Sequence, residues 1–250
     1  KDLASSLLSL TPETKEYYLQ KHPLMYASFI EEASRYKMNI QALLSNNDWA
    51  LLEYLDGFKK EVNVILNFNK KYKYKFEAVH LDIEPHLLEH WDDNIESYLA
   101  SYIDNLKEIR RLINEHNEES DDDLKLIIDI PFWYCQEKYN VGDNNTVDLL
   151  LEVVDGITIM DYTKKQTDFV NYAVEVLEIA EKHKDMTVEI AMEFNPDIKE
   201  SIADKDLQEL QTYINESVPE FEKYKVFKGL SFHDYSSYQK YVLDNMEDNW

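Results

Sequence analysis

Two carboxylates at the end of an apolar run, Asp82 and Glu84, are the residues best suited to chemistry in this sequence. The run Ala78–Ile83 has the alternation of a β-strand, which puts its odd-numbered apolar positions on one face. His80, Asp82 and Glu84 share the opposite face. Two carboxylates held close together raise one another's pKa, so we expect Asp82 to stay ionised and Glu84 to keep its proton near neutral pH. A protonated carboxyl can act as a general acid on a leaving oxygen.

Six short apolar runs with the character of strands alternate with longer segments of helical spacing. Alternation of this kind predicts a parallel sheet with helices packed outside it. Apolar residues recur near every 3.6 positions in Asn94–His116, Asp168–His183 and Lys205–Asn215, as in amphipathic helices. The six expected strands are Met38–Leu44, Ala78–Ile83, Leu124–Ile130, Gly156–Met160, Thr187–Met192 and Gly229–Phe232.

This pattern, in a chain of 250 residues, predicts an α/β protein with one domain over residues 1–250, a (β/α)8 TIM barrel. Because six clear strands are visible, we expect the barrel to be incomplete or truncated at its N-terminus. The first residues predict one long helix, capped by Thr11-Pro12, and a remnant strand in Ser5–Leu10. The chain starts at Lys1 rather than Met, which we interpret as a trimmed or processed start with the native N-terminus missing.

The other strands also end in polar residues, and catalytic groups of such barrels lie at the C-terminal ends of strands. Inward-facing positions there predict a shared site lined by Asp129, Tyr162, Glu193 and His233, together with Asp82 and Glu84. Aromatic side chains follow nearly every strand and could either stack on a flat substrate or pack within loops. The residues expected to bind substrate are His80, Asp129, Trp133, Tyr134, His233, Tyr235, Trp49 and Trp91.

The segment Phe76–Glu84 resembles the fourth-strand motif of family 18 glycoside hydrolases, the chitinase-like barrels. That motif runs Asp-x-x-Asp-x-Asp-x-Glu, and its last two acids stand here as Asp82 and Glu84. Glu77 and His80 occupy the two earlier acidic positions. The resemblance is to a chitinase-like bacterial group of barrels, and it implies a hydrolase that acts on a glycan outside the cell or at its surface.

The segment Ile159–Tyr162 resembles the sixth-strand Met-x-Tyr of the same family. The resemblance implies that Glu84 protonates the leaving oxygen and that Asp82 orients a substrate N-acetyl group, which is the internal nucleophile. Tyr162 would steady that group. Where the family usually has a tryptophan on its eighth strand, this chain has Ser231-Phe232-His233, so the resemblance stops short of naming chitin as the substrate.

Two further interpretations remain open for the same carboxylates. In a retaining glycosidase of the larger barrel clan, Glu84 would be the acid/base and Glu193, three strands further on, the nucleophile. That mechanism needs the two carboxyl groups about 5 to 5.5 Å apart. Alternatively, the altered acids at Glu77 and His80 are compatible with a barrel that binds a glycan or a protein without cleaving it.

A third interpretation is a zinc peptidase, because His86-Leu87-Leu88-Glu89-His90 matches the pattern H-x-x-E-H. On a helix the two histidines would share a face and could bind one metal ion. No third ligand can be placed from the sequence, so we expect no metal site and no other cofactor. Elemental analysis that finds about one zinc per chain, lost in His90→Ala, would favour the peptidase.

Composition limits the partners. The formal net charge of −24 repels phosphate backbones and anionic lipid, so nucleic-acid binding and membrane-surface binding are not expected. No run of about 18 apolar residues predicts membrane insertion. Cys135 is the one cysteine, which excludes an internal disulfide and a multi-cysteine zinc site. The expected partner is a carbohydrate, and the sequence gives no indication of an oligomeric state.

Overall fold

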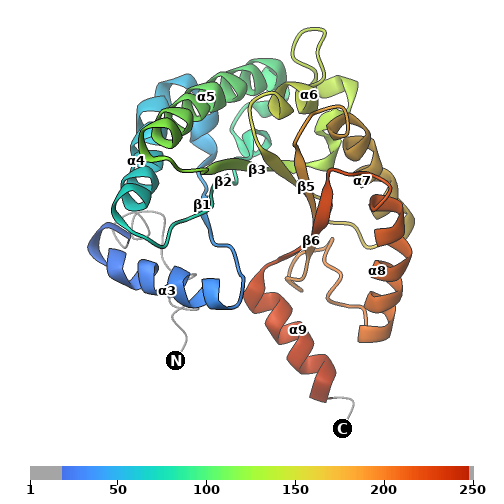
Figure 1. The fold of residues 1–250 in the computed structure, drawn as a ribbon. Helices are drawn as coiled ribbons and strands as arrows, with labels where there is room; N and C mark the ends of the chain where they lie inside the picture. Colours follow the sequence, from blue (N-terminus) through green and yellow to red (C-terminus); the bar gives the residue numbers. More distant parts are fainter. Residues whose placement is uncertain (1–18, 248–250) are drawn as a thin grey trace. The chain divides into compact units, whose positions relative to one another are not determined.

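The structure is a computed structural model that describes residues 19–247. The chain divides into two compact units, Lys1–Ile127 and Ile128–Trp250. Its six strands are parallel and follow one another in the order β1-β2-β3-β4-β5-β6 (Figure 1). The cap expected at Thr11-Pro12 and the strand expected in Ser5–Leu10 lie outside the described residues.

The first unit alternates helices and strands. β1 pairs with β2 in parallel, in a register that sets Leu44 opposite Leu81. The backbone N–H of Lys125 donates to the carbonyl of Glu77, which joins the start of β3 to the start of β2. The elements of this unit are α3 (Pro23–Arg35), β1 (Gln41–Leu44), η1 (Asn47–Ala50), η2 (Leu52–Tyr54), α4 (Leu55–Lys71), β2 (Ala78–Leu81), η3 (Pro85–Leu87), α5 (Trp91–Ser120) and β3 (Lys125–Pro131), which runs on into the second unit.

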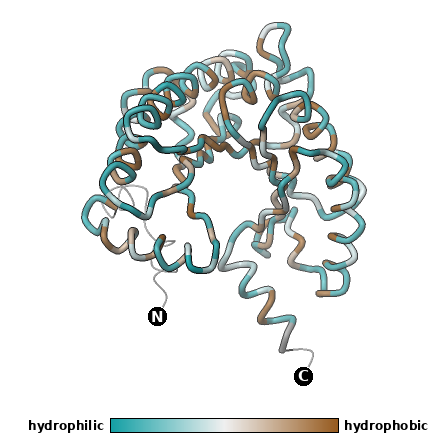
Figure 2. The backbone as a smooth tube through the Cα atoms, viewed as in Figure 1, coloured by the Kyte–Doolittle hydropathy of each residue, from teal (hydrophilic) through white to brown (hydrophobic). Residues whose placement is uncertain are grey.

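The core of the first unit follows the expected alternation. Val79, Leu81 and Ile83 are buried, whereas the residues between them are only partly covered. In α5 the buried side chains recur at helical spacing, for example Leu99, Ile103 and Leu106. Figure 2 shows the hydrophobic residues concentrated along the strands, while the outer turns of the helices are largely hydrophilic.

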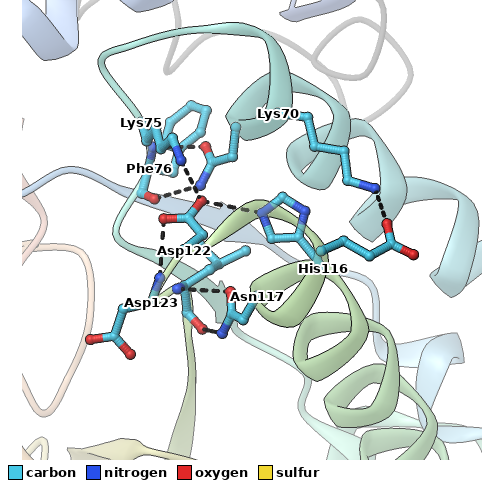
Figure 3. A network of polar contacts seen from close by, with 10 residues as sticks. Lys70, Lys75, Phe76, His116, Asn117, Asp122 and Asp123 are labelled. Atoms are coloured by element: carbon cyan, nitrogen blue, oxygen red, sulfur yellow. Dashed lines mark hydrogen bonds and ion pairs between the residues drawn. The ribbon is translucent and has the colours of Figure 1, made fainter.

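A polar network fixes the points at which β2 and β3 begin (Figure 3). The amide of Asn69 accepts from the backbone N–H of Phe76 and donates to its carbonyl, at 3.0 and 2.8 Å. Asn117 makes the same pair of bonds with Leu124, at 3.1 and 3.0 Å. Between these two clamps, the carboxylate of Asp122 lies 3.0 Å from Lys75 Nζ and 3.2 Å from Nε2 of the buried His116. Side-chain amides therefore provide the hydrogen bonds of the backbone N–H and carbonyl groups just before β2 and β3.

The second unit continues the alternation of strand and helix. β4 pairs with β5 and β5 with β6, both in parallel. The register of the second pair sets Glu193 opposite His233. The elements are η4 (Phe132–Cys135), η5 (Glu137–Tyr139), α6 (Thr146–Leu151), β4 (Gly156–Met160), α7 (Gln166–Ala180), β5 (Thr187–Glu193), α8 (Leu207–Phe221), β6 (Phe227–His233) and α9 (Tyr235–Glu247).

β4 and β5 approach closely at the start of their pairing. Gly156 lies opposite Thr187, and a Cβ added to Gly156 would contact Thr187 Oγ1 and lie 3.0 Å from the Thr187 carbonyl oxygen. Thr187 Oγ1 donates to the carbonyl of Asp155 at 3.2 Å, which holds this side chain over the glycine. A residue without a side chain is therefore required here by steric contact rather than by backbone conformation.

The predicted α/β class and the predicted order of strands are confirmed. All six expected runs form strands, with ends that differ by up to three residues, and each of the three expected helices lies within α5, α7 or α8 or overlaps it. Residues 19–247 contain six strands, so the structure does not show a complete eight-stranded barrel in the part of the chain that it describes. Within those residues, no helix combines the length and the apolar character that crossing a membrane requires.

Candidate functional site

Glu84 is held at the C-terminal end of β2 by two contacts. Its backbone N–H donates to Oδ1 of Asn47, at 2.8 Å, and Asn47 opens the short helix that follows β1. Its carboxylate Oε2 lies 3.2 Å from Nε2 of His86, and the Glu84 side chain remains 26% exposed. Glu84 is therefore a partly covered carboxyl with a defined position, open on one side to solvent.

Asp82 and His80 lie on the same strand face as Glu84, as expected from the alternation. The backbone N–H of Asp82 donates to the carbonyl of Leu44 at 2.9 Å, which extends the pairing of β1 and β2 by one residue. Nδ1 of His80 lies 2.6 Å from Oε1 of Gln41, on β1. Asp82, like Glu84, is half-buried.

The segment His86–His90 does not form the helix that the zinc-peptidase interpretation requires. The 3-10 helix η3 ends at Leu87, Leu88 is extended, and His90 has a left-handed backbone with φ of 63°. His86 pairs with Glu84, whereas His90 lies 3.4 Å from the exposed Glu89. The two histidines thus lack the shared helical face of an H-x-x-E-H metal site. Among the described residues, no cluster of three or more His, Cys, Asp or Glu side chains could hold a metal ion.

The two tryptophans of the first unit have different surroundings. Trp49 was expected to contact substrate, but it is 8% exposed and stacks on Phe58 with ring centroids 4.8 Å apart. Its carbonyl also accepts a hydrogen bond from Asn105, so this residue packs α4 and α5. Trp91, at the start of α5, is half-buried with its ring 6.4 Å from that of His86. Of the two rings, only that of Trp91 lies near the contact between Glu84 and His86.

In the second unit, three predicted site residues meet at the ends of three consecutive strands. Oε2 of Glu193, the last residue of β5, lies 2.9 Å from Nδ1 of His233, the last residue of β6. The His233 ring lies nearly parallel to that of Tyr162, two residues after β4, with centroids 6.0 Å apart. The inward faces of β4, β5 and β6 therefore converge as the sequence predicts.

Each oxygen of the Glu193 carboxylate has a hydrogen-bond partner. Oε1 accepts from the backbone N–H of Asn195 at 2.6 Å, Oε2 faces His233, and the side chain is 4% exposed. The Glu193 carbonyl also accepts from Ser201 Oγ and from the backbone N–H of Ile202, at 3.1 and 2.9 Å. A nucleophile needs an oxygen that can reach the substrate, so this arrangement favours an orienting role for Glu193 over the nucleophilic one.

Asp161 directly precedes Tyr162, and it is not among the residues predicted to form the site. It is fully buried, and its Oδ1 accepts from Thr163 Oγ1 at 3.1 Å. Burial raises the pKa of Asp161 to about 8, against hydrogen bonds from Thr163 and the Ala173 backbone, with a further increase from the Asp168 carboxylate. The hydroxyl of Tyr213 on α8 donates to the Thr163 carbonyl at 2.8 Å. Asp161 is therefore a buried carboxylic acid near neutral pH, within the helix layer.

The remaining predicted residues of the second unit differ in their exposure. Asp129 is half-buried in β3. Tyr134 is 1% exposed and packs edge-on against the half-buried Trp133, with centroids 4.8 Å apart, and its binding of substrate stays a prediction. Tyr235 is 62% exposed at the start of α9. Burial and the Glu175 carboxylate raise the pKa of Cys135 to about 12, so its thiolate is scarcely populated near neutral pH.

Three of the residues that hold Glu84 and Glu193 were not predicted as site residues, whereas the fourth, His233, was. Asn47 could have been found by the rule used elsewhere, because it follows β1 as Glu84 follows β2. His86 entered only as a metal ligand of the alternative zinc-peptidase interpretation, and its contact with Glu84 was not foreseen. Asn195 contributes its backbone N–H to Glu193, and no side-chain pattern reveals a contact of that kind.

Comparisons with known proteins give similarities of structure only. No family model matches the chain, and no curated protein matches it. A solved structure, chitinase ChiA74 from Bacillus thuringiensis, is similar over 66% of this chain and 30% of its own, with 13% sequence identity and a TM-score of 0.41. The chain thus spans about a third of the length of that chitinase.

Proposed function

We propose that this protein is a glycoside hydrolase that acts on an extracellular or cell-surface glycan, with Glu84 as its general acid. Asp82 orients the substrate and Tyr162 supports it, roles assigned from the resemblance of their two motifs to those of family 18 glycoside hydrolases. The proposed reaction is substrate-assisted and retains the configuration of the sugar.

The position of Glu84 carries this proposal. Glu84 follows β2, its backbone is bonded to Asn47, and its carboxylate lies 3.2 Å from His86 while a quarter of the side chain stays open to solvent. A general acid must hold one position and still reach the leaving oxygen, and Glu84 meets both conditions. The C-terminal end of a parallel strand is also where barrel enzymes place such groups.

In the proposed reaction, the carbonyl oxygen of the substrate's N-acetyl group attacks the anomeric carbon while the glycosidic C–O bond breaks. Glu84 gives its proton to the departing oxygen, and Asp82 holds the N–H of the same acetamido group. Glu84 then takes a proton from the water that opens the cyclic intermediate, which restores the acid. No metal or other cofactor takes part in these steps.

The rival interpretations make different demands on Glu193 and Glu84. A retaining glycosidase with Glu193 as the nucleophile needs one carboxylate oxygen to reach the anomeric carbon, whereas both oxygens are hydrogen-bonded, to Asn195 and His233, and the side chain is 4% exposed. The engagement of both Glu193 oxygens supports the substrate-assisted mechanism over the retaining pair. A barrel that only binds a glycan would use the same surfaces without cleavage. Its affinity for the glycan would not depend on a proton on Glu84.

The test is a screen of chitin, cello- and xylo-oligosaccharides for release of new reducing ends, with calorimetry for binding. On any glycan that the wild type cleaves, we expect Glu84→Gln to lower kcat by about a hundredfold or more and to leave binding intact. Glu89→Gln is the matched control, because Glu89 is five residues away with a side chain that is 89% exposed. An unchanged rate for Glu84→Gln contradicts the proposal, and binding without cleavage by the wild type favours the non-catalytic barrel.

A further inference from the structure

We propose that Glu193 and His233 form a carboxylate–histidine pair that presents Nε2 of His233 as the hydrogen-bond acceptor for a hydroxyl group of the bound glycan. The choice of a glycan as the ligand rests on the proposed function. The pair itself lies wholly within the second unit and is defined by contacts there.

The protonation of the His233 ring follows from what Glu193 can accept. A carboxylate oxygen accepts, so the contact of Nδ1 with Oε2 at 2.9 Å assigns the ring hydrogen to Nδ1. In a neutral imidazole with its proton on Nδ1, Nε2 carries a lone pair and accepts. Glu193 thereby determines which nitrogen of His233 faces the ligand.

Glu193 is suited to this task because it is itself immobilised. Its side chain is 4% exposed, and its second oxygen is held by the N–H of Asn195 at 2.6 Å. Ser201 and Ile202 bind its carbonyl, so the loop after β5 is fixed to the residue that orients the histidine. A positioning group held in this way keeps its direction when a ligand arrives.

The other side of His233 is accessible. The side chain is 59% exposed although its Nδ1 faces a buried carboxylate. The nearly parallel ring of Tyr162, 6.0 Å away, adds a flat surface beside it. A sugar ring can pack on such a surface while one of its hydroxyls donates to Nε2. An anionic group is a poor alternative, because it would approach the Glu193 carboxylate in a chain of net charge −24.

The first experiment reads the tautomer without any substrate. We expect ¹⁵N–¹H correlation spectra of the histidine side chains to show His233 protonated on Nδ1 and not on Nε2. Glu193→Ala should move His233 toward protonation on Nε2. His183 is an internal control, since its Nε2 lies 2.7 Å from Oδ1 of Asp148 and should carry the proton. Nε2 protonation of His233 in the wild type would overturn the proposal.

The second experiment measures the role of Nε2 in binding, with chitotetraose as the probe. His233→Asn keeps a donor near the position of Nδ1 and has no atom at that of Nε2. We expect this variant to bind chitotetraose about tenfold more weakly, the effect of one hydrogen bond. Asp148→Asn, which alters the control pair, should not change the affinity.

The outcomes separate this inference from the proposed function. If His233→Asn binds chitotetraose as the wild type does, or if the wild type does not bind it, the inference is wrong. The role of Glu84 is then still decided by the cleavage screen. If His233→Asn weakens binding and no glycan is cleaved, the inference stands while the proposed hydrolase activity fails.

Discussion

Glu193 and His233 are register partners at the last positions of β5 and β6, and their side chains lie on the same face with Oε2 and Nδ1 2.9 Å apart. Adjacent parallel strands place paired residues side by side, so this contact follows directly from the register. Under the proposed mechanism Glu193 orients His233, whereas a retaining pair would use it as the nucleophile, so variants of Glu193 distinguish the two mechanisms.

The first prediction is a ranking of two carboxylates on a glycan that the wild type cleaves. Asp82→Asn should lower kcat by about a hundredfold or more, the usual effect of losing a group that orients the reacting atoms. Glu193→Gln should retain most of kcat and raise KM, since Glu193 acts through His233. Steady-state kinetics measure both. The opposite ranking would favour a retaining pair with Glu193 as the nucleophile.

The second prediction concerns the pH dependence of stability that Asp161 imposes. Its pKa is about 8 in the folded protein against 3.8 for an ordinary Asp, so the unfolded chain loses its proton first as pH rises. The contribution of Asp161 is fully present below about pH 4 and falls by about 1.4 kcal/mol per pH unit up to pH 8.

Asp161→Asn removes this titration, so its free energy of unfolding should fall less steeply than that of the wild type between pH 4 and 8. Urea denaturation at several pH values measures the slope. Asp185→Asn is the control, because the Asp185 side chain is 84% exposed and should leave the slope unchanged. Equal slopes for Asp161→Asn and the wild type would contradict the assignment of a neutral buried acid.

The third prediction contrasts two glycines. Gly156→Ala would place a methyl group against Thr187 Oγ1 and should destabilise the protein by about 1 to 3 kcal/mol, as overpacking does. Gly57→Ala has nothing within 4 Å of the added carbon and lies within α4, so it should stabilise by about 0.5 to 1 kcal/mol. Thermal unfolding measures both, and Thr187→Ala should relieve part of the first effect. Equal effects of the two substitutions would show that β4 and β5 do not approach this closely.

The fourth prediction concerns the network in Figure 3. Asp122→Ala deprives Lys75 and His116 of a shared acceptor and should lower the free energy of unfolding by about 1 to 3 kcal/mol. Burial acts to raise the pKa of Asp122, but the hydrogen bonds from Lys75, His116 and the Asp123 backbone, together with the charge of Lys75, lower it overall. Its stabilisation is therefore present above the ordinary Asp pKa and is lost as pH falls below it.

The adjacent Asp123→Ala is the matched control for this network, since its side chain is 84% exposed. It should change the stability by less than about 0.5 kcal/mol. Chemical denaturation of the two variants at neutral and acidic pH tests the prediction. If Asp123→Ala destabilises the protein as much as Asp122→Ala does, the network does not depend on the covered carboxylate.

The sequence determined the order of strands and the face on which each candidate residue lies. A strand places alternate residues on opposite faces whatever its neighbours are, so the burial of Val79 and Leu81 and the partial exposure of Asp82 follow from local pattern. The same local rule put Tyr162, Glu193 and His233 at strand ends, where the structure brings them together.

The tertiary structure decided which of these side chains are engaged and by what. Glu84 is held by Asn47, 37 positions earlier, and Glu193 by His233, 40 positions later. Trp49 and Trp91 look equivalent in the sequence, but one stacks in the core on Phe58 while the other stays half-buried near His86. Contacts of this kind depend on register and on the path of loops, which arise from packing across the whole unit. Local periodicity does not predict them, because it indicates only which face of each segment is buried.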